Sequence, residues 1–302
     1  MGSALVLEGC PRSFSNSPAM NLTEQLKGNC VSDCGKKIRL NRIVRPDRKS
    51  LVVAFDHALV LGPISGTENA ADQVRRFTEA GVDAVLMNLG LMRRCFSSLL
   101  GPVMPGIIAR IDWTTLWGTP GGDGDSATLR SCLLARPEDA MRNGADAVLT
   151  YLAVGTGDSD FETKEVARNA DVARECERIG MPLIIETLAR GKNVKNPSDS
   201  KWLKLHTRMA VELGADLIKT DYAGDSASMR GVVDECPIPI LVLGGSRYSS
   251  DAEALALIHG AVAAGAAGVF FGRNVFQAND MLAFLQNARA ALNEREVSPA
   301  GR

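Results

Sequence analysis

The chain has 302 residues, of which 45% are hydrophobic, so it is long enough to bury a large core in a single α/β domain. Its 34 basic and 35 acidic residues give a formal net charge of −1, which argues against nucleic acid or an anionic membrane as a partner. The seven cysteines lack CxxC spacing, and no apolar run approaches the roughly 20 residues of a membrane span. We therefore expect a soluble, cytoplasmic protein without a metal site.

Two regions are expected along the chain. Residues 1–25 mix Ser, Asn, Pro and Gly with little periodicity and predict a loosely ordered N-terminal arm. Residues 26–302 are expected to form one domain, in which short apolar runs alternate with amphipathic helical segments. The eight runs are Leu51–Phe55, Ala84–Met87, Gly106–Ile111, Ala147–Leu152, Pro182–Thr187, Leu217–Thr220, Ile238–Leu243 and Gly268–Phe271. Such strands suit a parallel sheet covered on both faces, and their number predicts a (β/α)8 TIM barrel with an N-terminal extension.

A weak internal repeat supports an α/β architecture. Related pentapeptides, three of them Gly-x-Asp followed by two apolar residues, begin at Gly81, Gly144, Gly214 and Gly265 and follow helical segments. Each is typical of a helix-to-strand junction in which glycine ends the helix in a left-handed conformation. A doubly wound sheet uses the same junctions, so the strand count rather than the repeat favours the barrel.

Lys219 is the sharpest candidate for chemistry, because in a barrel the reacting groups lie where strands end. It interrupts the apolar stretch Leu217–Thr220, and a lysine in a buried strand is costly unless its charge is paired or lost. A neutral amine is the nucleophile of imine formation, but an ordinary pKa near 10.4 leaves only about one molecule in 2,500 neutral at pH 7. The alternative is that Lys219 is the counter-ion of a strand-end carboxylate such as Asp56 or Glu186.

Three further side chains lie at strand ends and have two interpretations each. Asp56 can move a proton beside an imine or hold a substrate hydroxyl, or it can cap the loop. His57 can bond a substrate oxygen, although a histidine next to an aspartate is also typical of a structural hydrogen-bond partner. Tyr151 can act as general acid or base at a carbon–carbon bond, or it can pack as an aromatic anchor under a loop.

The last two strand ends predict a phosphate site. Gly244-Gly245-Ser246 and Gly272-Arg273 offer backbone N–H groups that an anion can approach closely, together with one positive charge. The loops after the seventh and eighth strands are the usual phosphate cup of a TIM barrel. Glu186, at the end of the fifth strand, is included among the expected substrate-binding residues.

Taken together, these motifs resemble one family. Phe55-Asp56-His57, Gly214–Thr220, Leu243-Gly244-Gly245 and Gly272–Gln277 are similar to the archaeal-type class I fructose-bisphosphate aldolases, over roughly residues 27–292. Their relatives, the aminodideoxyheptulosonate phosphate synthases and the autoinducer-2 phosphate thiolases, share the likeness. The resemblance implies that Lys219 is a Schiff-base lysine, Asp56 a catalytic carboxylate, and Arg273 with the glycine-rich ends a phosphate site. It also implies a homo-oligomer, often a decamer of stacked rings of five, and no cofactor beyond the covalent lysine imine.

Two positions depart from the family pattern. Ala153 stands where the fructose-bisphosphate aldolases carry a catalytic tyrosine, and Ala58 stands where the Asp-His-Gly pattern has glycine. Tyr151 lies two residues before Ala153, hence on the same face of the strand, and is the candidate substitute. These departures bear on the glycolytic substrate more than on the imine chemistry.

The leading hypothesis is a metal-independent class I aldolase that cleaves or forms a carbon–carbon bond in a phosphorylated ketose or related keto phosphate. One alternative is a transferase that uses the same imine, either an aminodideoxyheptulosonate phosphate synthase or an acyl-transferring thiolase. Another is a non-catalytic barrel that only binds a sugar phosphate. Product formation with and without an acceptor separates the first two, and borohydride trapping separates both from the third.

Overall fold

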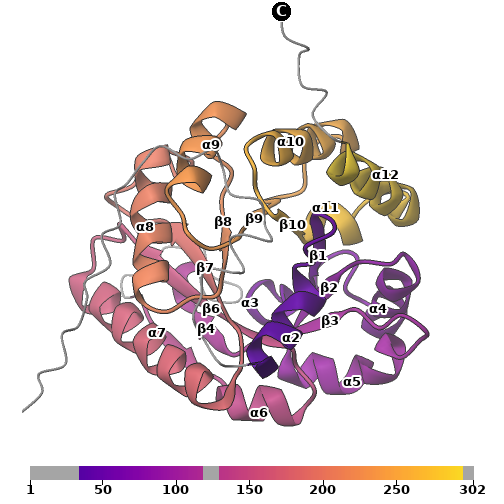
Figure 1. Ribbon diagram of the computed structural model, residues 1–302, viewed down its shortest axis with the longest axis horizontal. Helices are drawn as coiled ribbons and strands as arrows, with labels where there is room; N and C mark the ends of the chain where they lie inside the picture. The colour runs from indigo at the N-terminus through magenta and orange to yellow at the C-terminus, as the bar shows by residue number, and fades with distance from the viewer. Residues whose placement is uncertain (1–33, 118–128, 295–302) are drawn as a thin grey trace, which may run out of the picture.

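Eight parallel strands close into a barrel with helices outside it, as the view along the barrel shows (Figure 1). This computed structural model describes residues 34–117 and 129–294, so the arm predicted for residues 1–25 lies outside the described residues. Around the barrel the strands run in the order β1 (Ser50–Ala54), β2 (Ala84–Asn88), β3 (Gly106–Arg110), β6 (Ala147–Val154), β7 (Leu183–Ala189), β8 (Leu217–Thr220), β9 (Ile240–Leu243) and β10 (Gly268–Phe271). The predicted (β/α)8 barrel is confirmed.

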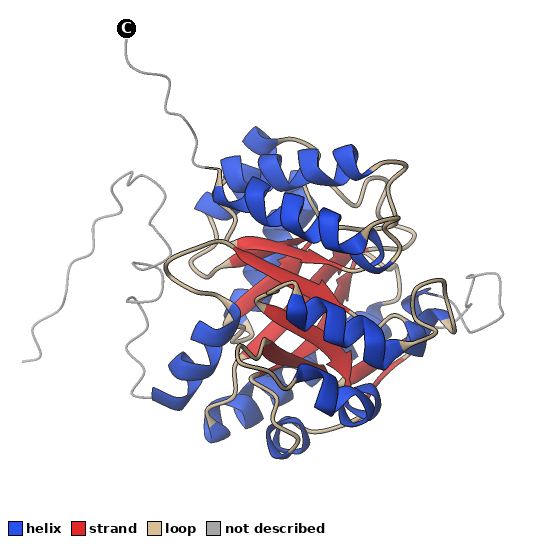
Figure 2. Ribbon diagram, turned by 90° about the vertical axis from the view of Figure 1, so that its right-hand side faces the viewer, coloured by secondary structure: helices blue, strands red, loops and turns tan. Residues whose placement is uncertain are grey.

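Helices cover the strands on the outside of the barrel, as the side view shows (Figure 2). The helices of the described residues are α2 (Cys34–Ile43), α3 (Ala58–Leu61), α4 (Ala70–Glu79), α5 (Leu89–Leu99), α6 (Pro137–Arg142), α7 (Ser159–Ile179), α8 (Ser200–Glu212), α9 (Ser226–Asp234), α10 (Asp251–Ala263), α11 (Arg273–Phe276) and α12 (Met281–Asn293). Several begin after an Asp, Asn or Ser whose side chain accepts a hydrogen bond from a first-turn N–H, as Asp158 does before α7. In the described ranges, no helix combines the length and the apolar character that crossing a bilayer requires.

Two features of the strands differ from the sequence-based expectation. Strands β6 and β7 stay paired as far as Val154 and Ala189, two residues beyond the predicted ends, so Tyr151 lies within β6 rather than at its end. A short antiparallel hairpin, β4 (Asp112–Thr114) with β5 (Ser131–Leu133), also follows β3. The β6–β7 side of the barrel therefore projects further than its neighbours.

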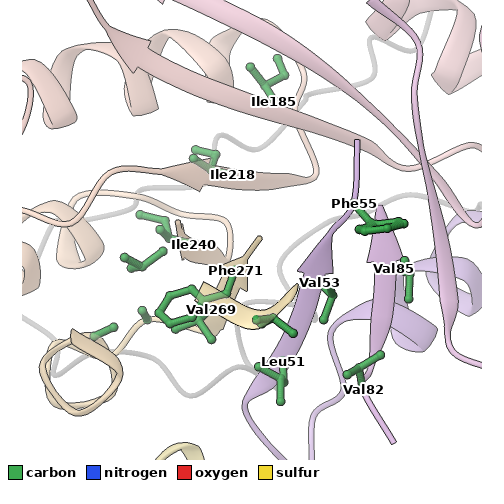
Figure 3. Close-up of a cluster of buried hydrophobic side chains, with 14 of the residues drawn as sticks. Leu51, Val53, Phe55, Val82, Val85, Ile185, Ile218, Ile240, Val269 and Phe271 are labelled. Atoms are coloured by element: carbon green, nitrogen blue, oxygen red, sulfur yellow. The ribbon is translucent and has the colours of Figure 1, made fainter. Parts of the chain in front are cut away.

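Alternation along each strand divides the apolar residues between two cores. On β1, Leu51 and Val53 face outward and pack with Val85, Val269 and other side chains beneath the helices (Figure 3). The intervening Val52 faces inward and belongs to a second cluster inside the barrel. Leu40, Ile43 and Val44, from α2 and the residue after it, join this inner cluster and close the N-terminal end of the barrel. The end of the barrel that is open to a ligand is therefore the carboxyl end of the strands.

The repeated Gly-x-Asp junctions work as clamps between neighbouring strands. Each glycine has the predicted positive φ, from +71° at Gly81 to +97° at Gly214. Each aspartate then accepts a hydrogen bond from the backbone N–H near the start of the preceding strand, at 2.8–2.9 Å. The donor and acceptor residues are Leu51 with Asp83, Ile107 with Asp146 and Leu183 with Asp216. Cations at the base of the barrel pair with these carboxylates, as Arg42 does with Asp146 at 2.7 Å.

We expect Asp146→Ala to lower the free energy of unfolding by about 2–4 kcal/mol, because the buried N–H of Ile107 loses its acceptor and Arg42 loses its partner. Asp160→Ala is the matched control, since Asp160 forms only an exposed pair with Lys164 and its loss is expected to cost less than about 0.5 kcal/mol. Urea unfolding of both variants at pH 7 provides the measurement. Equal effects would show that the junction aspartates do not clamp the barrel.

Candidate active site

The carboxyl end of the barrel opens into a cavity of about 390 Å³. All ten site residues expected from the sequence line it: Asp56, His57, Tyr151, Glu186, Lys219, Gly244, Gly245, Ser246, Gly272 and Arg273. They come from strands β1, β6, β7, β8, β9 and β10 or from the loops that follow these strands. The closed barrel therefore brings together residues that lie as much as 217 positions apart in the chain.

Arg110 is the central charge of this site, although it was not among the site residues expected from the sequence. Its side chain is 1% exposed. From the end of β3 the guanidinium contacts Asp56 beyond β1 and Glu186 on β7, and it lies 3.3 Å from Asp112. It also stacks 3.7 Å from the centre of the Tyr151 ring. One buried cation thus joins side chains from opposite sides of the barrel mouth.

Lys219 is buried and has Glu186 as its ion-pair partner in the described part of the chain. The Nζ atom lies 2.8 Å from Glu186 Oε1 and 4.7 Å from the centre of the Phe270 ring. Strand pairing sets this contact, because Glu186 is the register partner of Lys219 on one side and of Tyr151 on the other. Lys219 thus has a strand-end carboxylate as its counter-ion, and that carboxylate is a proton acceptor 2.8 Å from the amine.

The cations keep the two central carboxylates ionised. Burial alone would raise the pKa of Asp56, but Arg110, with smaller contributions from His57 and Lys219, lowers it to about 2. Burial also opposes ionisation of Glu186, whose pKa is nevertheless lowered by Lys219 and Arg110. Tyr151 behaves in the opposite way, because burial raises the pKa of its hydroxyl well above 10 despite the nearby Arg110. The site thus combines two carboxylates with a neutral phenol.

His57 lies between Asp56 and the glycine-rich loop that follows β10. A Cβ atom on Gly272 would be 2.3 Å from His57 Cε1, so glycine is required there for the imidazole to fit. Burial, helped by Lys219 and Arg273, lowers the pKa of His57 to about 4, so the ring is neutral at pH 7. Its Nδ1 atom lies 3.5 Å from Asp56 and makes no hydrogen bond within the described ranges. The ring is therefore able to bond a ligand.

The predicted phosphate cup is held in shape by Asn274. Its side-chain amide donates to the carbonyl oxygens of Gly244 and Ser246 at 3.0 and 3.1 Å, and its oxygen accepts from the Tyr248 N–H at 2.9 Å. This leaves Arg273 beside the cup, with a buried Nε that has no partner among the described residues. In the sequence Asn274 was only one residue of the Gly272–Gln277 motif, because its role depends on a contact between the loops after β9 and β10.

The opposite wall of the cavity contains Leu188 and Arg190, to which sequence reasoning gave no site role, and Trp117, for which the sequence allowed either a substrate lid or a surface loop. Trp117, Leu188 and Arg190 line it beside Tyr151. Arg190 belongs to the part of the β6–β7 side that extends beyond the predicted strand ends, and it forms a double ion pair with Asp221. Across residues 34–117 and 129–294, no group of three or more His, Cys, Asp or Glu side chains is arranged to hold a metal ion.

Residues 50–278 match a family model described as DeoC/LacD family aldolase. The chain belongs to this aldolase family. It is 38% identical over 247 residues to the 2-amino-3,7-dideoxy-D-threo-hept-6-ulosonate synthase of Halobacterium salinarum, which covers 82% of this chain and 87% of that protein. It is also 28% identical over 286 residues to the 3-hydroxy-5-phosphonooxypentane-2,4-dione thiolase of Salmonella typhimurium, covering 94% of this chain and 91% of that one.

A solved structure extends the likeness to Schiff-base chemistry. An archaeal fructose-1,6-bisphosphate aldolase, with its catalytic lysine covalently bound to the carbinolamine intermediate of the substrate, superposes with a TM-score of 0.73 at 25% identity. That match covers 85% of this chain and 99% of the archaeal one. The resemblance drawn from the motifs is confirmed, and the protein is an enzyme of an aldolase family in which lysine Schiff bases occur.

We expect Arg110→Met in this aldolase to lower the free energy of unfolding by about 3–5 kcal/mol at pH 7, because it leaves buried carboxylates without their cation. Without Arg110 the folded-state pKa values of Asp56 and Glu186 rise, so the folded variant binds more protons than the folded wild type on acidification. The deficit should therefore shrink between pH 7 and pH 5.

Urea unfolding at both pH values measures this change. Arg142→Met removes an exposed arginine paired only with Glu138 and is the control, with an expected cost below about 0.5 kcal/mol. A deficit for Arg110→Met that is independent of pH would argue against unpaired carboxylates as its cause.

Proposed function

We propose that this protein is a class I aldolase in which Lys219 forms a Schiff base with the carbonyl group of a phosphorylated keto substrate. The carrying observation is the position of Lys219, which is buried on a barrel strand with its amine 2.8 Å from Glu186 and shares the cavity with an anion-binding cup. A buried lysine that faces a substrate-sized cavity, with a proton acceptor beside its amine, suits imine formation.

Glu186 is proposed to carry the proton of the lysine, a role different from the substrate binding first expected of it. It takes a proton from the Lys219 ammonium group, and the neutral nitrogen then bonds to the carbonyl carbon. That nitrogen passes one of its remaining protons to the carbonyl oxygen, which becomes the hydroxyl of a carbinolamine, and Glu186 returns its proton as that hydroxyl leaves as water. The resulting iminium ion keeps Glu186 as its counter-ion and accepts the electron pair of the breaking carbon–carbon bond.

Tyr151 and Asp56 are proposed to manage the oxygens of the substrate. The Tyr151 hydroxyl is neutral, so it can protonate the aldehyde oxygen during bond formation. The transient phenolate would be stabilised by Arg110, whose guanidinium carbon lies 3.7 Å from the centre of the Tyr151 ring. In the cleavage direction the phenolate takes the proton of the substrate hydroxyl as the carbon–carbon bond breaks, and it then gives that proton to the enamine carbon. Asp56 is ionised, with a pKa of about 2, which suits a carboxylate that holds a substrate hydroxyl and stabilises the iminium charge.

The phosphate of the substrate is assigned to the cup formed by the backbone of Gly244, Gly245, Ser246 and Gly272 with the Arg273 side chain. The unpartnered Nε of Arg273 supplies a charge-assisted donor there. Neutral His57, next to Gly272, supplies a further hydrogen bond. This arrangement places the phosphorylated part of the substrate on the β9, β10 and β1 side of the cavity.

A transferase that uses the same imine is the second candidate. It is supported by the 38% identity to a heptulosonate synthase and by Ala153 at the position of the family tyrosine. A lyase releases its aldehyde from the keto phosphate alone, whereas a transferase or thiolase needs an acceptor for turnover. Product formation with and without added aldehyde or coenzyme A distinguishes the two.

We also propose a cellular compartment and an oligomeric state for the enzyme. The five cysteines in the described ranges, Cys34, Cys95, Cys132, Cys176 and Cys236, are all free thiols, which supports a reducing compartment such as the cytoplasm. A homo-oligomer, including a decamer, stays a proposal that rests on the family resemblance. Analytical ultracentrifugation of the full chain tests it.

Borohydride reduction with dihydroxyacetone phosphate should add the mass of one reduced adduct to the wild type and none to Lys219→Met. The reason is that only a lysine imine is trapped in this way. Intact mass spectrometry gives the readout, and Lys204→Met, which removes a surface lysine of α8 paired with Glu235, should retain the adduct. An adduct that persists in Lys219→Met would overturn the assignment. No adduct in the wild type with any of a panel of keto phosphates would favour the binding-only barrel.

Two conservative variants should separate imine formation from bond cleavage. Glu186→Gln removes the proton carrier and should slow the appearance of the trapped adduct by about 10²- to 10⁴-fold. Tyr151→Phe keeps the ring against Arg110 and should form the adduct at close to the wild-type rate, yet lose a similar factor in the rate of carbon–carbon cleavage. Quench-flow trapping and aldehyde release are the two measurements. The same slow step in both variants would contradict the proposed division of roles.

A further inference from the structure

The cavity has two walls of different chemistry, and the strand order sets them opposite each other. The β9, β10 and β1 side carries the anion cup and His57, whereas β3, β6 and β7 complete the opposite side of the ring. We define the acceptor wall as Trp117, Tyr151, Leu188 and Arg190. If a keto phosphate occupies the cup and bonds to Lys219, the second substrate of the proposed aldolase lies against this wall.

Arg190 is the cation of the acceptor wall, but its charge is cancelled. Its Nη1 and Nη2 atoms lie 2.9 and 3.1 Å from the two carboxylate oxygens of Asp221, and Nη1 also donates to the Ala189 carbonyl at 2.8 Å. A bidentate pair of this kind uses the N–H donors that would otherwise bind a phosphate. Arg273, across the cavity, has no such carboxylate partner among the described residues.

Charge balance over the lining leads to the same conclusion. Arg110 and Lys219 are offset by Asp56 and Glu186, with which they make close contacts. Since Asp221 offsets Arg190, the described lining keeps one uncompensated cation, on Arg273. One phosphate satisfies that site. A second phosphate on the acceptor would meet no free positive charge among the described lining residues.

The remaining side chains of the acceptor wall are aromatic or aliphatic. The rings of Trp117 and Tyr151 have centroids 6.3 Å apart and are tilted by 58°, and the Arg190 guanidinium lies 5.7 Å from the centre of the Trp117 ring. Leu188 is fully buried beside them. Aromatic faces and a neutralised guanidinium favour uncharged groups over strongly hydrated anions.

We propose that the carbonyl acceptor, or the aldehyde released on cleavage, is an uncharged aldehyde without a phosphate, and that Asp221 sets this specificity by neutralising Arg190. The proposal rests on the aldolase function proposed above. It distinguishes this enzyme from one whose substrate is a bisphosphorylated ketose.

The test compares kcat/KM for D-glyceraldehyde 3-phosphate and for D-glyceraldehyde, two acceptors that differ only in the phosphate, with dihydroxyacetone phosphate as donor. We expect a phosphorylated-to-unphosphorylated ratio of one or below for the wild type. Asp221→Asn keeps the shape of the side chain but frees the charge of Arg190, and it should raise the ratio at least about tenfold. Asp234→Asn, an exposed change at the end of α9, is the control and should leave the ratio as in the wild type.

A wild-type ratio above one would overturn the proposal even if Asp221→Asn did not fold. A ratio in Asp221→Asn that rises less than tenfold would overturn the role of Asp221. Borohydride trapping of the wild type with the donor alone keeps these failures separate from failure of the aldolase itself. A trapped adduct together with a wild-type ratio above one would contradict only the acceptor proposal. The lack of any adduct would contradict the aldolase function on which that proposal rests.

Discussion

The buried guanidinium of Arg110 is the interaction on which the rest of the site depends. Two buried carboxylates and a buried lysine amine could not lie together unless their charges were matched at short range. Arg110 supplies that match for Asp56 and Glu186, and Glu186 in turn leaves one oxygen for Lys219. The reactive amine therefore meets a carboxylate that is already fixed in place. Such fixed charges need little rearrangement as an iminium ion appears, which is the condition for electrostatic catalysis.

Much of the fold could be predicted because it is encoded locally. Apolar runs such as Leu51–Phe55 identify barrel strands, and the positive φ at Gly81 and Gly214 follows from glycine at a helix end. Lys219 could be found from its position alone, since a buried strand excludes lysine unless it has a partner or a task. Strand ends were adequate markers of the cavity because the barrel turns every carboxyl end toward the same opening.

The rest could not be predicted because it depends on contacts between distant parts of the chain. Arg110 meets Glu186 across 76 positions, and only the closed barrel shows that the two side chains share a layer. The Arg190–Asp221 pair depends on β7 running beyond its apolar stretch, which no local pattern marks. Likewise, the motif Gly272–Gln277 contains Asn274 but does not show its role. Its hydrogen bonds to the loop after β9 form because the ends of β9 and β10 are adjacent in the barrel. In each case the missing information was which strands are neighbours or face each other.

The aspartate clamps at the base of the barrel are present in three strand pairs and missing from the fourth. Reciprocal bonds join β1 to β2 through Asp83, β3 to β6 through Asp146, and β7 to β8 through Asp216. The fourth unit, β9 with β10, has Ala267 in the corresponding place and keeps only the backbone bond from Ala267 N to the Ile240 carbonyl. That unit carries the anion cup. Three of the four strand pairs thus have a carboxylate clamp at their base, whereas the pair that carries the anion cup lacks it and is tied instead at its carboxyl end, through Asn274.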